Sequence, residues 1–294
     1  MKSGFVSIVG RPNVGKSTLL NKLLNKKIAI TSDKVGTTRN MIYGVYNEDD
    51  TQIVFVDTPG INKATSKLGE VLNKTAYSSF DNDLVLFLVD IASGFGPNDN
   101  KILNRLKEDN KDVILVLTKV DKIKKDKLYD EITKLKDLYN FLDIVPISSI
   151  KGINTTELIE VIKKYLKDDV KYFDDDVITN VSEKFLVGEI IREKVLNLTR
   201  EEVPHAVTCV VENMEFKKDK CYINACIVVD RDNLKGIIIG KNGQMLKKIG
   251  SMAREEIEVL LGKKVYLELF VKVIDNWRQK PNLFQELGIS EEDD

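Results

Sequence analysis

A short run near the start of the chain has the clearest chemical pattern. It reads Gly10-Arg11-Pro12-Asn13-Val14-Gly15-Lys16-Ser17 and fits the phosphate-binding pattern G-x-x-x-x-G-K-[ST]. Its glycines let backbone N–H groups approach a phosphate chain, Lys16 adds a positive charge, and Ser17 offers a hydroxyl to Mg²⁺. We therefore expect this loop, together with Thr18, to bind a nucleoside triphosphate.

A second cluster, Asp57-Thr58-Pro59-Gly60, follows the strand-like residues 53–56. A carboxylate at that strand end can hold Mg²⁺ through water beside Lys16 and Ser17. The same tetrapeptide is a common turn signal, but its place after a phosphate loop favours the nucleotide-binding interpretation.

Two further clusters suit the recognition of a guanine base. Thr118-Lys119-Val120-Asp121 follows residues 113–117, and a carboxylate such as Asp121 can accept both adjacent N–H donors of guanine, which adenine lacks. Lys119 can lay its aliphatic stem along the base. Ser148-Ser149 follows residues 144–147 and offers a backbone N–H to the guanine carbonyl. The alternative interpretation of residues 118–121 is a lysine-rich surface cluster without a ligand. The alternative for Ser148-Ser149 is an ordinary serine loop.

The elements that position these clusters alternate between strand-like and helical patterns. Buried strand-like runs occur at 5–9, 53–56, 84–89, 113–117 and 144–147, and residues 17–25 form a helix after the phosphate loop. This alternation predicts an α/β fold with a doubly wound, mostly parallel sheet. Residues 41–46 pair with 53–56 as one antiparallel edge. Ligands of such sheets bind at the carboxyl ends of the strands, where all four clusters lie.

Composition sets the class of the protein. The 294 residues are 43% hydrophobic, which allows two domains, and the net charge of −1 means that nucleic acid must be bound by local basic patches. No apolar run reaches the roughly 20 residues of a membrane span, and no signal peptide is seen, so we expect a cytoplasmic protein. Cys209, Cys221 and Cys226 lack metal-ligand spacing and are expected to be reduced thiols.

The second half of the chain has a different order of elements. An acidic passage at 168–180 is expected to be a solvated linker, with Tyr172 and Phe173 as candidates for packing against one domain. The acidic tail is expected to be mobile. Between them we predict helix, strand, strand, helix, the glycine motif Gly240-Lys241-Asn242-Gly243, a helix at 244–261 and a strand at 265–273. Lys241, Lys247, Lys248 and Arg254 would supply positive charge for RNA. The alternative is a helix-turn-helix corner with solvated lysines.

These motifs together carry a family resemblance that covers essentially the whole chain. Residues 1–167 look like a translation-factor-class P-loop GTPase, and Gly36-Thr37-Thr38-Arg39 resembles the first switch of the Era family of bacterial GTPases. Residues 181–294 resemble a smaller α+β KH domain of type II, whose G-x-x-G loop clamps single-stranded RNA. The resemblance implies that Ser17, Asp57 and Thr38 hold Mg²⁺, with Thr37 as the competing candidate. It also implies that Lys16, Thr38 and Gly60 act in catalysis, while the segments 31–40 and 57–66 respond to the γ-phosphate.

The chain departs from the usual GTPase pattern at three positions. Thr118 replaces an asparagine, Ser149 replaces an alanine, and Ile61 stands where many small GTPases have a water-positioning glutamine. We expect guanine preference to survive and intrinsic hydrolysis to be slow. Asn13 matches the asparagine of potassium-activated relatives, so we also hypothesise a K⁺ ion beside it.

The resemblance implies a function beyond the residues themselves. It implies a GTP- and GDP-binding, Mg²⁺-dependent GTPase that binds the 3′ end of small-subunit (16S) ribosomal RNA and acts in 30S subunit assembly. A cytoplasmic monomer with a peripheral membrane contact is expected. The alternative is a regulatory GTPase acting on a protein or membrane partner, with the KH fold kept as a scaffold.

Overall fold

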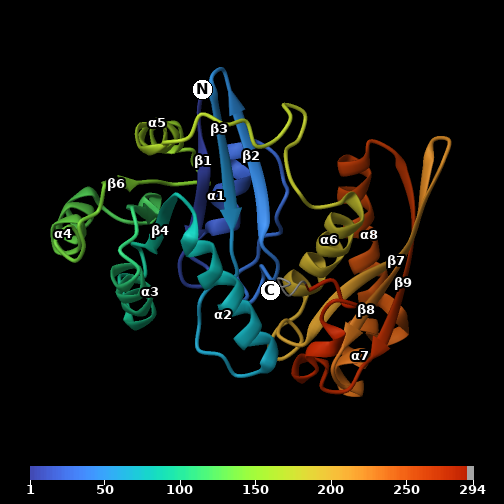
Figure 1. The fold of residues 1–294 in the computed structure, drawn as a ribbon. Coiled ribbons are helices and arrows are strands. Elements are labelled where there is room, and N and C mark those ends of the chain that lie inside the picture. The colour runs from blue at the N-terminus through green and yellow to red at the C-terminus, as the bar shows by residue number, and fades with distance from the viewer. Residues whose placement is uncertain (290–294) are drawn as a thin grey trace. The chain divides into compact units, whose positions relative to one another are not determined.

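The computed structural model describes residues 1–289 and contains two compact units (Figure 1). The first comprises Met1–Ala29, Thr38–Lys63 and Leu72–Asn180, and the second comprises Ile30–Thr37, Ala64–Val71 and the chain from Val181 onward. Two short stretches of the first half therefore pack with the second half. The domain boundaries expected at residues 167 and 181 stay predictions, and the acidic tail at 290–294 lies outside the described residues.

The first unit is built on a six-stranded sheet in the order β2-β3-β1-β4-β5-β6. Only β2 and β3 pair antiparallel, which confirms the predicted edge, and the other pairs are parallel. Its strands are β1 (Lys2–Val9), β2 (Ile42–Glu48), β3 (Thr51–Asp57), β4 (Leu84–Asp90), β5 (Val113–Thr118) and β6 (Asp143–Pro146). Every residue of β4 and β5 is buried, as expected for parallel strands covered on both faces.

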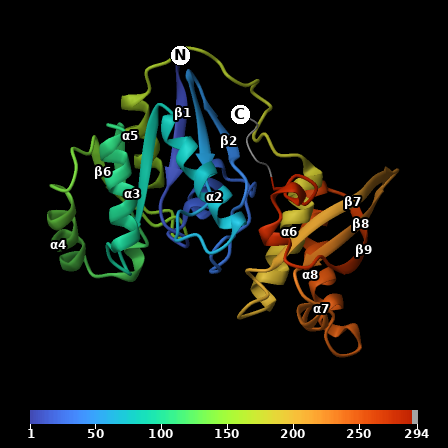
Figure 2. The ribbon, with the colours of Figure 1, turned by 60° about the horizontal axis from the view of Figure 1, so that its bottom comes forward.

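Helices cover both faces of this sheet. They are α1 (Lys16–Leu24), α2 (Lys67–Ser78), α3 (Pro97–Glu108), α4 (Lys125–Leu135) and α5 (Thr155–Tyr165). Apolar side chains of α2, α3 and α4 share one core cluster with β4 and β5, and Figure 2 shows α2 and α3 crossing the same face. Helix α1 packs with β2, β3 and α5 on the other face. The fold is thus doubly wound, as predicted.

The second unit is an α+β layer structure with the predicted order of elements. Its sheet runs β7-β8-β9, with β7 antiparallel and β9 parallel to β8. The elements are α6 (Glu183–Leu198), β7 (Val207–Lys217), β8 (Lys220–Val229), α7 (Asp232–Ile239), α8 (Gln244–Leu261) and β9 (Lys264–Val273). Alternate residues of β9, from Val265 to Val273, join one apolar core with α6, α7 and α8, which confirms the period-two pattern in the sequence.

The acidic passage is exposed at Asp174, Asp175 and Asp176, while Tyr172 and Phe173 pack on the first unit, as expected for these two residues. The buried Gln52 amide oxygen accepts from the backbone N–H groups of Tyr172 at 2.8 Å and Phe173 at 3.0 Å. The Tyr172 ring lies edge-on to Phe5 at 4.7 Å between centroids. A buried amide needs such partners, and they hold the passage against β3.

No helix among residues 1–289 is long and apolar enough to span a membrane. The three cysteines are free thiols, and burial raises the pKa of Cys209, Cys221 and Cys226 above the ordinary thiol value.

Candidate functional site

The register of the first sheet brings the predicted nucleotide clusters to one edge. Ile8 of β1 is level with Asp57 of β3, and Asp90 of β4 is level with Thr118 of β5. The phosphate loop follows β1 directly, so its backbone, Asp57 and Thr118 meet at the carboxyl ends of neighbouring strands. This edge is the ligand position of open α/β sheets.

Lys16 lies inside the phosphate loop. Its Nζ donates to the backbone oxygens of Gly10 at 3.1 Å and Arg11 at 3.2 Å. Burial lowers the pKa of Lys16 to about 8, although the nearby Asp57 carboxylate opposes this shift. The ammonium group is thus held where a phosphate chain would restore its preference for the charged form.

Ser17, Thr38 and Asp57 form a compact group of oxygen donors. The Ser17 hydroxyl donates to Asp57 Oδ2 at 2.6 Å and lies 2.9 Å from Thr38 Oγ1. Thr37, the competing candidate, turns its hydroxyl away and donates to the backbone oxygen of Lys34 at 2.7 Å. The structure therefore brings Thr38, and not Thr37, to the predicted metal position.

This group has the chemistry of a Mg²⁺ site. The buried Asp57 Oδ1 has no hydrogen-bond partner within residues 1–289, and Mg²⁺ prefers hard oxygen ligands of this kind. Burial raises the pKa of Asp57 to about 6, while Lys16, Ser17 and the Thr58 backbone act in the opposite direction. A divalent cation would remove the cost of ionising this carboxylate.

Gly60 and Ile61 are both closely packed against neighbouring residues. A Cβ at Gly60 would lie 2.8 Å from the backbone N and Cα of Pro12, so only glycine lets the two loops approach this closely. Ile61 is 5% exposed and belongs to the same core cluster as Val9 and Phe87. Its side chain is thus a core residue and has no group that can orient water.

The predicted base-binding residues take three different roles. The Thr118 hydroxyl donates to the Val14 backbone oxygen at 2.8 Å, so it fastens the phosphate loop to β5. Lys119 Nζ donates to the Asn13 backbone oxygen at 2.7 Å and to Asp90 Oδ2 at 2.7 Å. By contrast, the exposed Asp121 carboxylate has no partner in the described part of the chain and can accept from a base.

The serine loop is held by its own backbone. Ser148 exchanges backbone hydrogen bonds with Ile153, and its hydroxyl accepts from the Lys151 N–H at 3.2 Å. The neighbouring Ser149 N–H makes no hydrogen bond within residues 1–289, which leaves it able to donate to a ligand carbonyl. Because residue 149 would contact the ligand through its backbone N–H, serine in place of alanine is tolerated.

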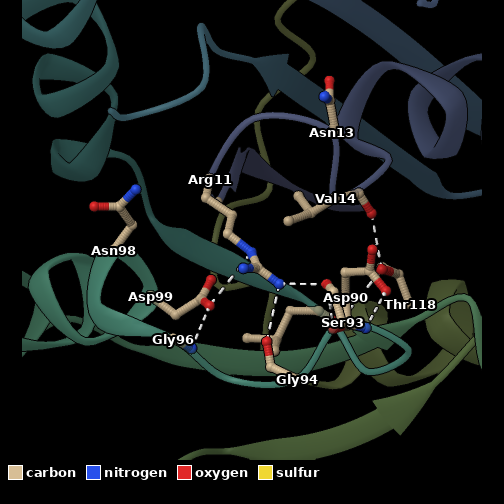
Figure 3. A network of polar contacts seen from close by, with 12 residues as sticks. Arg11, Asn13, Val14, Asp90, Ser93, Gly94, Gly96, Asn98, Asp99 and Thr118 are labelled. Atoms are coloured by element: carbon tan, nitrogen blue, oxygen red, sulfur yellow. Dashed lines mark hydrogen bonds and ion pairs between the residues drawn. The ribbon is translucent and has the colours of Figure 1, made fainter. Parts of the chain in front are cut away.

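Sequence reasoning missed a polar network that braces the phosphate loop (Figure 3). Arg11 Nη2 donates to Ser93 Oγ at 2.6 Å and to the Gly94 oxygen at 2.9 Å, and its Nε lies 3.4 Å from the buried Asp99. The Lys119 ammonium also holds the pKa of Asp90 below its usual value, although burial acts to raise it. Asp90 directly follows the strand-like run 84–89 of the sequence, and that position was the signal that could have found it.

In the second unit, the glycine motif joins α7 to α8. A Cβ at Gly240 would lie 2.7 Å from Met245 Cβ, so a larger residue cannot fit there. Asn242 and Gly243 both have positive φ, at 52° and 74°, and Gly243 is the N-cap of α8. The exposed Lys241 and Asn242 form the tip between the two glycines.

A groove of about 390 Å³ runs from this motif along α8 and β9. Among the predicted RNA-binding residues, Lys247 and Arg254 line it together with Gly243, whereas Lys248 does not. The residues missed by sequence reasoning are Leu246, Gly250, Ser251, Leu267 and Leu269. The helical spacing of 243, 247, 250 and 254 could have identified Gly250, but only the sheet places β9 opposite.

Comparison with known proteins agrees with both halves. Residues 5–119 match the family described as 50S ribosome-binding GTPase, and residues 202–278 match the KH domain family. A crystal structure of an Era variant from Aquifex aeolicus bound to GDP and AlF4⁻ is 43% identical, with a TM-score of 0.95 over 99% of this chain and 100% of that one. The chain belongs to the Era family. Another Era structure contains MgGDPNP and nucleotides 1506–1542 of 16S ribosomal RNA, and is 43% identical over 99% of each chain, with a TM-score of 0.95.

Family membership confirms the main predictions from the sequence. This Era-family chain is a GTPase with a C-terminal KH domain, and its parallel sheet is that of a P-loop GTPase.

Proposed function

We propose that this chain is a GTP-driven switch that binds the 3′ end of small-subunit ribosomal RNA in the cytoplasm and acts in 30S assembly. One observation carries the proposal: the chain shares 43% identity over 99% of its length with an Era protein holding both MgGDPNP and 16S nucleotides 1506–1542. The glycine-motif groove and the phosphate loop support the proposal as candidate sites for the RNA and the nucleotide. The assembly role is tested by holding the protein in its GTP-bound state in cells and asking whether 30S precursors co-purify with it.

Different residues of the chain have different roles in binding the nucleotide. Lys16 and the N–H groups of the loop bind the phosphates, Ser17, Thr38 and Asp57 hold Mg²⁺, and Asp121 selects guanine. When bound, Mg²⁺ offsets the negative charge that grows on the phosphate oxygens. The buried Ile61 supplies no water-positioning group, so hydrolysis by the protein alone is slow.

A potassium ion beside Asn13 is a further part of the proposal. Asn13 is exposed in the loop, and its side chain points away from the Arg11 and Asp99 network (Figure 3). A cation there would stabilise charge that an arginine finger stabilises in other GTPases. GTP turnover should be faster in KCl than in NaCl, and Asn13→Ala should remove the difference. Equal turnover in both salts would show that no such ion acts.

RNA binding by the groove can be tested without disturbing its glycines. Lys241→Asp combined with Asn242→Asp places two carboxylates at the exposed tip, and aspartate tolerates the positive φ of position 242. We expect binding of short single-stranded RNA to be lost, while GTP binding stays unchanged. Undiminished RNA binding would favour the alternative of a regulatory GTPase with the KH fold as a scaffold.

A further inference from the structure

A dense group of positive charges lies at the opposite end of the KH sheet from the glycine motif. It consists of Lys217, Lys218 and Lys220 in the β7–β8 hairpin and Lys263 and Lys264 in the turn between α8 and β9, and we call it the lysine cluster. Figure 1 shows the hairpin and this turn at one end of the unit and α7 at the other. All five lysines are exposed, and Asp219 is the only acidic residue in runs 216–220 and 262–264.

The strand register concentrates the charges. Lys217 lies opposite Lys220, and Lys220 lies beside Lys264, so one row crosses all three strands. Lys263 completes the group, because its Nζ donates to the Lys218 backbone oxygen at 3.1 Å. Like charges directly opposite each other destabilise a sheet. Glu215 offsets part of this repulsion, because its carboxylate lies 3.1 Å from Lys217 Nζ. A bound polyanion would offset more of it.

An exposed aromatic ring accompanies the lysines. Phe216 is 48% exposed, and Lys263 Nζ lies 6.0 Å from the centre of its ring. Exposed aromatic rings beside basic side chains provide stacking surfaces for unpaired bases, with a cation next to the ring for the phosphate.

The groove leads toward the cluster. Its lining ends at Arg254 and Leu267, and the acidic residues Glu255, Glu256 and Glu258 follow along α8. Glu256 pairs with Lys194. The Glu258 carboxylate lies 3.4 Å from Arg254 and 3.5 Å from Lys264, and accepts from the Val265 N–H at 3.0 Å. The charge of Glu258, the acidic residue of α8 that contacts Lys264, is therefore balanced by basic neighbours.

The length of α8 separates the two basic regions. The helix has 18 residues, which corresponds to about 27 Å between the glycine motif and the cluster. A G-x-x-G clamp holds only about four nucleotides. An RNA held by this clamp can therefore reach the cluster only if it continues past the groove.

We propose that the lysine cluster is a second RNA site, which holds the phosphate backbone of the segment leaving the groove between α8 and β9. This inference rests on the proposed function, because it requires single-stranded RNA in the groove. An RNA already bound at the groove reaches the cluster as part of the same molecule, which favours RNA over a lipid surface or an acidic protein.

The test compares a neutralised cluster with a matched control. Lys218, Lys220 and Lys263 are changed to Gln, and the control changes the exposed Lys101, Lys125 and Lys127 to Gln in the GTPase half. Both are assayed with RNA of nucleotides 1506–1542 and with hexamers taken from it, over a range of KCl concentrations. For the cluster variant we expect the affinity for the long RNA to fall about tenfold or more and the affinity for hexamers to change less than about twofold. The plot of log affinity for the long RNA against log KCl concentration should have a slope about two units shallower.

Three results would overturn the proposal: unchanged binding of the long RNA, an equal loss in the control variant, or an equal loss on hexamers. A cluster variant that keeps RNA binding but no longer sediments with phosphatidylserine vesicles would assign the surface to membrane instead. An unchanged thermal unfolding temperature would show that the variants remain folded. Failure of the wild-type protein to bind hexamers would count against the groove, and is thus distinguishable from failure of the cluster.

Discussion

The backbone N–H of Thr31 donates to Glu193 Oε1 at 2.8 Å, which fixes the start of the predicted first switch to helix α6 of the second unit. The next residue of α6, Lys194, pairs with Glu193 at 2.8 Å, and the preceding Arg192 donates to the Thr37 backbone oxygen. Both ends of the segment Ile30–Thr37 are therefore held by consecutive residues of one helix. Thr38, bonded directly to Thr37, presents its hydroxyl to Ser17. One peptide bond thus joins a segment held by α6 to the predicted Mg²⁺ site.

This arrangement predicts that Arg192 couples the nucleotide state to RNA binding. Its side chain is fully buried and pairs with Glu189 at 2.6 Å, so Arg192→Lys keeps the charge but loses the fork that reaches both partners. In the Arg192→Lys variant, we expect the RNA affinities measured with a GTP analogue and with GDP to lie within about twofold of each other. The free energy of unfolding should fall by about 1–3 kcal/mol. Arg200→Lys, on the exposed surface, is the control. A ratio of these two affinities that stays at the wild-type value in a folded Arg192 variant would disprove the coupling.

The two adjacent threonines make a matched pair. Thr38→Ala removes a hydroxyl 2.9 Å from Ser17, whereas Thr37→Ala removes one that only closes a turn to Lys34. We expect Thr38→Ala to weaken Mg²⁺-dependent binding of a GTP analogue by about tenfold or more and to leave GDP binding nearly unchanged. Thr37→Ala should bind both nucleotides like the wild type. The reverse pattern in titration calorimetry would transfer the metal role to Thr37.

Nucleotide binding should weaken at low pH because Asp57 becomes protonated. Its pKa of about 6 in the free protein means that the carboxylate is protonated below that pH, while Mg²⁺ requires the ionised form. Affinity for Mg²⁺ and GTP should therefore fall as pH drops through 6, with proton release on binding near pH 6. Calorimetry in buffers of different ionisation enthalpy measures that release, and Asp57→Asn should lack this component. Identical proton release in both proteins would rule it out.

The same shift affects the stability of the free protein. A raised carboxyl pKa stabilises the fold at low pH, and this contribution is lost as pH rises from the ordinary value of 3.8 through about 6. The difference corresponds to roughly 3 kcal/mol. Without nucleotide, Asp57→Asn should thus melt at a higher temperature than the wild type at pH 7, and the gap should close at pH 4. A gap that does not depend on pH would contradict the assignment.

Guanine selection should depend on Asp121. Its exposed carboxylate is free to accept two donors, and Asp121→Asn replaces one acceptor oxygen by an amide donor. We expect GTP affinity to fall by about two orders of magnitude, since charge-assisted hydrogen bonds contribute about 1.5–3 kcal/mol each. ATP affinity should stay low and unchanged. Asp126→Asn, exposed on α4, controls for the loss of charge. A GTP affinity that survives Asp121→Asn would move base selection elsewhere.

The packed acidic passage should be released by changing Gln52. Gln52→Leu removes the acceptor of the Tyr172 and Phe173 N–H groups, at a cost of about 1–3 kcal/mol. Amide hydrogen exchange at residues 172–176 should become faster, whereas Gln285→Leu on the surface should leave it unchanged. Unaltered protection in the Gln52 variant would mean that the Phe5–Tyr172 contact alone holds the passage.

The sequence by itself determined the local patterns. The phosphate loop, the buried strands and the period-two strand at the end of the KH half follow from residue spacing, because glycine, charge and apolar alternation act over a few neighbouring residues. The positions of Asp57, Thr118 and Asp121 at strand ends were predictable for the same reason. Thr118 could be located but its partner could not, because Val14 is far from it in the chain.

Tertiary structure alone decided which distant groups meet. It turned Thr38 to Ser17 and Thr37 to Lys34, gave the buried Gln52 its partners in the acidic passage, and aligned lysines from three strands into one row. It also placed Ile30–Thr37 on α6 through Arg192 and Glu193, whose charges look like ordinary helix-surface residues in the sequence. The physical reason is that burial and pairing depend on which side chains the sheets and helices bring together, and sequence spacing does not record those distances.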